Sequence, residues 1–144
     1  MTDGEYAFGP SDPATLGAIR DVFVRHEPLV VEAAFDSALD PTTLAVDLAE
    51  GFAAAGRFDV RWSTRDFYSF HYTEPDLDFR FDYHPNPHSP PKHFHPPPDA
   101  ATDAVPSCIT VEQAERVTLA VCQCWRRGIE RDDPAAVNAA EDPP

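Results

Sequence analysis

The sequence predicts an α+β domain, with helices packed on one face of an antiparallel sheet of about four strands. Three runs between residues 58 and 83 alternate apolar and polar residues, which is typical of strands with one buried face. Two segments begin with an acid followed by proline and carry apolar residues at helical spacing, which predicts helices. A segment rich in histidine and proline precedes a C-terminal helix, so we expect it to form a loop at one edge of the sheet.

The N-terminal third is expected to contain two helices separated by a strand. Residues 12–26 begin with Asp-Pro and end before a proline, so they predict the first helix. Residues 29–36 are β-branched at their start and predict a strand. Residues 40–56 again begin with Asp-Pro and end at a glycine, so they predict a second helix. Its apolar residues recur every fourth position, at Leu44, Leu48 and Phe52.

Three strands follow, over residues 58–62, 68–72 and 77–83. The first two carry apolar residues at even positions, so an odd loop or a bulge around residues 64–66 must join them. A turn that pairs residue 73 with residue 76 keeps the apolar residues of the last two strands on one face.

The polar face of these strands gathers residues that can do chemistry. The predicted register places His71 opposite Asp78, with Arg80 one diagonal step away. The same face continues to Asp82 and His84. We therefore expect His71 to lie within reach of the histidines that follow.

The C-terminal part contains one further helix and a tail. Thr110-x-x-Gln113 is a capping box, which predicts a helix from there to about Gly128. We expect a single domain over residues 1–131, with a loose N-terminus over residues 1–10. Residues 132–144 are rich in Ala, Pro and Asp and are expected to be disordered.

The composition predicts a cytoplasmic protein adapted to salt. The net charge is −14, and the acidic residues are spread along the chain, which is typical of a hydrated acidic surface. This charge does not exclude a nucleic-acid substrate, because molar salt screens phosphate interactions for every protein. The three cysteines form no CxxC pair, which favours a reducing compartment. Neither a signal peptide nor a membrane span is expected.

A histidine cluster carries the functional argument, because the chain has no Walker loop, nucleophile elbow or Cys-paired zinc motif. Four of the six histidines lie between residues 84 and 95, together with the only lysine, Lys92. Their positions are His84, His88, His93 and His95.

Three interpretations of the cluster compete. His93 and His95 are two apart, so an extended backbone would point both at one zinc or related ion, with Asp82 or His84 as third ligand. Alternatively, two imidazoles transfer protons while Arg80 or Lys92 holds a phosphate, which needs no cofactor. In the third interpretation the segment is a rigid, solvated Pro-rich loop. We favour proton transfer, with His71 as a second partner.

The run from Tyr68 to about Trp125 resembles the TumE family, small toxins of type II toxin–antitoxin pairs. The residues that carry the resemblance are Phe70-His71-Tyr72, Leu77-x-Phe79-Arg80-Phe81-Asp82, Pro87-His88, His93-x-His95, and Ser107 followed by Ile109-Thr110-Val111-Glu112-Gln113-Ala114. The resemblance implies a growth-inhibiting toxin that a cognate antitoxin holds in check, and we expect a small helix-turn-helix protein in that role.

The sequence therefore predicts a toxin that acts on RNA by histidine-based acid–base cleavage of phosphodiesters. The alternative is a non-enzymatic metal-binding or protein-interaction module built on the same segment. No cofactor is expected under the favoured interpretation, whereas zinc is the expected ion under the alternative, held by His93, His95 and His84. The residues expected to act are His71, Arg80, Asp82, His84, His88, His93 and His95, with Arg80 and Lys92 binding the substrate.

Overall fold

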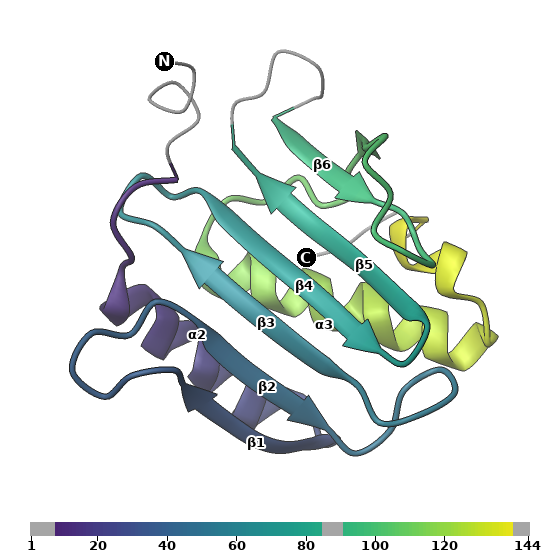
Figure 1. Cartoon of the computed structure of the whole chain (residues 1–144), viewed down its shortest axis with the longest axis horizontal. Coiled ribbons are helices and arrows are strands. Elements are labelled where there is room, and N and C mark those ends of the chain that lie inside the picture. The colour runs from purple at the N-terminus through teal and green to yellow at the C-terminus, as the bar shows by residue number, and fades with distance from the viewer. Residues whose placement is uncertain (1–7, 85–90, 140–144) are drawn as a thin grey trace.

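The computed structural model describes residues 8–84 and 91–139. It is an α+β fold, as predicted, in which two long helices accompany one antiparallel sheet (Figure 1). The elements in chain order are α2 (Pro13–His26), β1 (Val30–Phe35), β2 (Leu44–Leu48), β3 (Arg57–Trp62), β4 (Tyr68–Glu74), β5 (Leu77–Tyr83), β6 (Lys92–His95), β7 (Val105–Pro106), α3 (Ala114–Arg131) and the 3-10 helix η1 (Pro134–Asn138).

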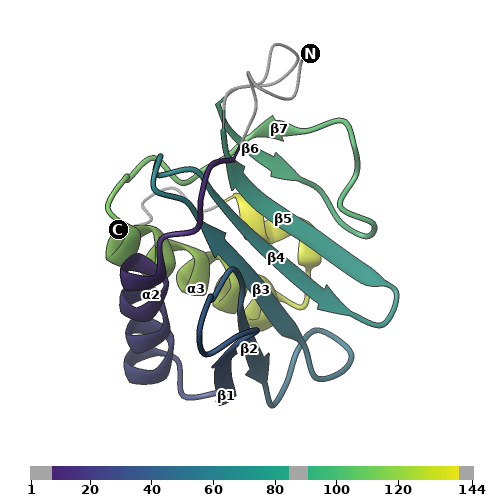
Figure 2. The same ribbon diagram turned by 60° about the vertical axis from the view of Figure 1, so that its left-hand side comes forward.

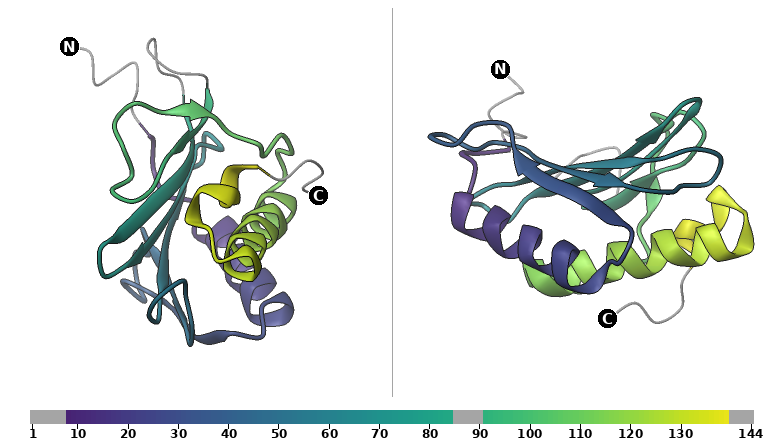
Figure 3. Two further views of the ribbon diagram at one scale, coloured as in Figure 1. Left: turned by 90° about the vertical axis from the view of Figure 1, so that its right-hand side faces the viewer. Right: turned by 90° about the horizontal axis from the view of Figure 1, so that it is seen from below.

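In the described part of the chain the sheet has seven strands rather than about four, and each strand pairs with the next one along the chain. Both long helices lie on one face, and none of the described residues forms a helix on the other face (Figure 3). Apolar side chains at alternate strand positions form a buried ladder across four strands, Val60–Phe70–Phe81–Phe94. Consequently, the polar residues of the same strands lie on the face away from the helices.

The prediction of a helix over residues 40–56 is wrong, because residues 44–48 form β2. Leu44, Val46 and Leu48 are all buried, so the apolar residues also repeat with the strand period of two. The loop after β2 is held by the buried carboxylate of Glu74. That carboxylate accepts hydrogen bonds from the Tyr72 hydroxyl and from three backbone amides, those of Phe52, Ala53 and Ala54.

The β4–β5 hairpin keeps the predicted alternation of faces, but its strands pair in a different register. Glu74 pairs with Leu77, so the turn consists of Pro75 and Asp76, and the register lies two residues from the predicted one. Proline fixes its own φ and Asp76 adopts a φ of 64°, which together set this tight turn. The odd loop predicted between β3 and β4 is confirmed, and it spans residues 63–67.

The segment predicted as a His/Pro loop is partly a strand. Residues 92–95 form β6, which pairs with β5, and β7 follows at the edge of the sheet (Figure 2). The remainder of that segment, residues 85–90, lies outside the described residues.

The chain ends also differ from prediction. α3 begins at Ala114 without a side-chain cap and continues past Gly128, so the predicted capping box and stop are wrong. Residues 134–138 form η1, whose Val137 is buried, so the prediction of a disordered tail is wrong for this part. The Pro10 carbonyl accepts a hydrogen bond from the Thr64 amide, so the chain is anchored at residue 10. Residues 1–7 and 140–144 lie outside the described residues.

Candidate functional site

The helix-free face brings together most of the predicted site residues. The strand register pairs Arg80 with His71 on one side and with His95 on the other. It also pairs Asp82 with His93. Because alternate residues of a strand share a face, these side chains lie on the same side of the sheet.

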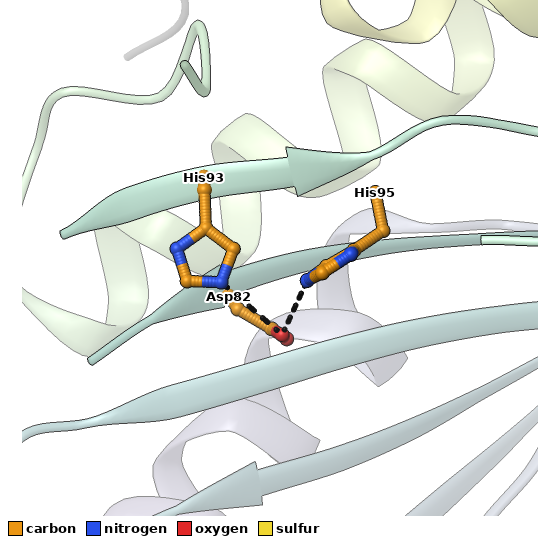
Figure 4. A group of neighbouring side chains, drawn as sticks. All are labelled: Asp82, His93 and His95. Atoms are coloured by element: carbon orange, nitrogen blue, oxygen red, sulfur yellow. Dashed lines mark ion pairs between the residues drawn. The ribbon is translucent and has the colours of Figure 1, made fainter. Parts of the chain in front are cut away.

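Three imidazoles surround one carboxylate oxygen. The Oδ2 atom of Asp82 lies 3.3 Å from Nε2 of His95, 3.7 Å from Nε2 of His93 and 3.9 Å from Nε2 of His84. Figure 4 shows His93 and His95 pointing from β6 toward Asp82 on the neighbouring strand. The predicted common direction of His93 and His95 is therefore confirmed. We call Asp82, His93 and His95 the Asp-His-His centre.

The members of this group differ in accessibility. The side chains of Asp82 and His93 are 4% and 1% exposed, so a large substrate cannot touch His93. His95 is 11% exposed, whereas His84 is 26% and Arg80 is 35% exposed. The centre is thus buried, with one imidazole and one guanidinium at its accessible margin.

Electrostatics keep Asp82 ionised. Burial raises the pKa of this carboxyl group, but the imidazoles of His93 and His95 and the charge of Arg80 outweigh burial and hold the pKa well below its usual range. The Arg80 Nε–H donates to Asp82 Oδ2 over 2.8 Å. The other oxygen, Oδ1, is buried and has no hydrogen-bond partner within the described residues.

The ring of His95 is oriented by the backbone. Its Nδ1 atom lies 2.8 Å from the carbonyl oxygen of Ala101, and a carbonyl can only accept, so Nδ1 carries a proton. This hydrogen bond directs the Nε2 atom of His95 toward Asp82.

A pocket of about 310 Å³ opens beside the Asp-His-His centre. Arg61 lies over the ring of Phe8, with its guanidinium carbon 4.2 Å from the ring centroid. The residues that line the pocket are Phe8, Arg61, Ser69, Arg80, Asp82 and His84. Sequence reasoning missed three of them. The odd-numbered polar face of β3 and β4 could have identified Arg61 and Ser69, but no signal in the sequence points to Phe8.

Two predicted residues that the structure describes, His71 and Lys92, belong neither to the pocket lining nor to the Asp-His-His centre. His71 lies on the same face, but its Nε2 atom is 3.4 Å from Asp78 and it does not line the pocket. Lys92 points to the opposite side of β6, where its Nζ donates to the carbonyl oxygens of Thr110 and Val111. His88 lies outside the described residues.

Within the part of the chain that the structure describes, no helix combines the length and apolar character needed to cross a membrane.

A protein-family model described as Toxin TumE matches residues 19–130. This match covers most of the chain and extends from α2 to α3, well beyond the segment that carries the sequence resemblance. No curated protein and no solved structure matches the chain.

Proposed function

This chain belongs to the Toxin TumE family, and from that premise we propose that it is a toxin that cleaves phosphodiester bonds in RNA at the pocket beside Asp82. One observation carries the proposal: three imidazoles converge on one buried carboxylate, next to an arginine at a pocket. Groups that move protons and a group that binds phosphate are two requirements of RNA cleavage.

The phosphate would be bound by arginine. Arg80 uses Nε to hold Asp82, which leaves its terminal nitrogens for a ligand in the pocket. A guanidinium matches the geometry of phosphate oxygens and stabilises the charge that develops during phosphoryl transfer. Arg61 lines the same pocket and supplies a second positive charge. Two local cations thus offset the acidity of the surrounding chain.

Proton transfer would involve His84 first. RNA cleavage by the 2′-hydroxyl needs a base that removes the hydroxyl proton and an acid that protonates the departing 5′-oxygen. His84 is the most exposed imidazole around Asp82 and lines the pocket. The other proton transfer would fall to the Asp-His-His centre. Within this centre His93 is too buried to touch RNA and acts by positioning its neighbours.

The toxin family implies a cognate antitoxin as partner. We propose that this antitoxin is a small helix-turn-helix protein and that both proteins act in the cytoplasm, where the RNA is. The antitoxin should relieve the effect of the toxin on growth when the two proteins are expressed together.

Expression in a host that tolerates a salty cytoplasm tests the proposal. The wild-type chain should slow growth and shorten cellular RNA, whereas His84→Ala and Arg80→Gln should do neither at equal protein levels. His26→Ala is the matched control, because His26 is an exposed histidine at the end of α2. Normal growth with intact RNA, at confirmed folded expression of the wild type, would reject the proposal.

A further inference from the structure

The separations within the Asp-His-His centre fit the ligands of a metal ion better than they fit hydrogen bonds. Charge-assisted N–H···O bonds are about 2.7–2.9 Å long. The Nε2 atoms of His95 and His93 lie 3.3 and 3.7 Å from Asp82 Oδ2. Two ligand atoms bound to one tetrahedral zinc ion at about 2.1 Å lie about 3.4 Å apart. The two separations therefore match the edges of a zinc coordination tetrahedron.

The orientation of the His95 ring also fits a metal ligand. The Nδ1 atom of His95 donates to the Ala101 carbonyl, and this contact directs the Nε2 atom toward the Asp82 carboxylate. Histidines that bind metals commonly donate their other N–H to a backbone carbonyl, as His95 does.

Asp82 supplies a second, independent observation. Its side chain is 96% buried, and its Oδ1 atom has no hydrogen-bond partner within the described residues. A buried polar atom without a partner is unfavourable, and a charged carboxylate oxygen is more so than a neutral group. A cation held by this carboxylate would lessen this cost, because its charge acts on both oxygens.

We propose that Asp82, His93 and His95 bind a divalent transition-metal ion. One ligand atom from each of the three residues lies within 4.8 Å of the others, and all three residues are buried. Two imidazoles with one carboxylate suit zinc and its first-row neighbours rather than magnesium or calcium. Three protein ligands are also the number found in catalytic zinc sites, where water occupies the fourth position.

The site differs from an ordinary zinc site through Arg80, whose Nε lies 2.8 Å from Asp82 Oδ2. A positive charge beside the ion opposes metal binding. Arg80→Gln should therefore keep the ion and bind it more tightly, by roughly tenfold. The same substitution removes the phosphate-binding group, so metal binding and RNA cleavage should respond in opposite directions.

Metal titration of the purified full-length chain tests the inference without RNA. After treatment with chelator and dialysis in potassium chloride, the protein should bind one zinc ion per chain by calorimetry. Cobalt should give the intense visible absorption of tetrahedral coordination. His95→Gln and Asp82→Asn should each weaken zinc binding by about a hundredfold or more. His26→Gln is the matched control and should bind zinc like the wild type.

The inference is overturned if the wild-type chain binds no zinc, or if zinc binding survives unchanged in folded His95→Gln protein. Circular dichroism checks the fold of each variant. Should a variant fail to fold, the cobalt spectrum of the wild type decides, because exposed histidines do not give a saturable tetrahedral spectrum at one ion per chain. RNA cleavage is measured separately, so loss of the metal inference does not decide the proposed function.

Discussion

Two buried carboxylates on neighbouring strands show how residue environment separates structure from function. Glu74 accepts four hydrogen bonds, from the Tyr72 hydroxyl and three backbone amides of the β2–β3 loop. Asp82 is equally buried, but it faces imidazoles at longer separations and has one oxygen without a partner in the described chain. The hydrogen bonds of the Glu74 carboxylate are made within the fold, whereas the Asp82 carboxylate can still bind a ligand.

We predict that Glu74→Gln lowers the free energy of unfolding by about 1–3 kcal/mol, because an amide cannot accept every hydrogen bond that the carboxylate accepts. Denaturant unfolding monitored by circular dichroism measures the difference. Glu32→Gln is a matched control, since Glu32 is exposed on β1. Equal losses in the two variants would contradict the structural function assigned to Glu74.

At the residue scale, much of the site was predictable from strand parity. The alternation placed Asp82 and His84 on one face, and the two-residue spacing of His93 and His95 indicated their common direction. The same alternation would have placed Lys92 on the opposite side, had residues 92–95 been recognised as a strand. Proline on both sides of that segment concealed its strand character.

At the element scale, the β1–β2 hairpin depends on one acidic side chain. Asp36 accepts hydrogen bonds from the Thr42 hydroxyl and from the backbone amides of Thr42 and Thr43. These bonds, led by that from the Thr42 hydroxyl, lower the pKa of Asp36 to about 2. The carboxylate therefore closes the loop that joins the first two strands.

This pKa gives a pH dependence with a definite sign. Because the pKa of Asp36 is lower in the folded state than in the unfolded state, its contribution is fully present above about pH 4 and is lost as the pH falls toward 2. We predict that Asp36→Asn flattens the loss of stability between pH 4 and pH 2. Urea unfolding at several pH values measures the slope. An unchanged slope relative to the wild type would show that the hairpin does not depend on this charge.

Elements whose signals agreed with one another were predicted well. Residues 13–26 combine a capping acid, a proline and an apolar stripe, and they form α2 as expected. The helix prediction for residues 44–48 was wrong because apolar residues spaced by four also fit the strand period of two. Pairing with β1 and β3 makes this segment a strand. Gly128 resembled a helix stop, but it lies inside α3, where an added Cβ would overlap with Val137 of η1, so close packing accounts for the glycine. Such tertiary contacts cannot be predicted from the local sequence.

At the scale of the whole molecule, the acidic surface predicts dependence on salt. Twenty-five acidic residues against eleven basic ones give a net charge of −14, which repels itself in dilute buffer. We predict that the melting temperature rises by roughly 5 °C or more between low and molar potassium chloride. Sodium chloride at equal ionic strength should act similarly, because screening does not depend on the cation. A melting temperature that stays constant with salt would contradict the prediction of a halophilic protein.

The arrangement of layers explains how a small chain presents this chemistry. Both long helices cover one face of the sheet, and within the described residues no helix covers the polar face (Figure 3). The pocket and the Asp-His-His centre occupy that polar face on strands β3 to β6.

Cleavage of end-labelled RNA by the purified chain tests the central claim most directly. In molar potassium chloride, the wild type and His26→Ala should convert the RNA to shorter fragments at equal rates. Arg80→Gln, folded by circular dichroism, should be slower by about a hundredfold or more, because it lacks the guanidinium that stabilises the phosphoryl charge. RNA that stays intact with the wild type, or that Arg80→Gln cleaves at the wild-type rate, would contradict the account.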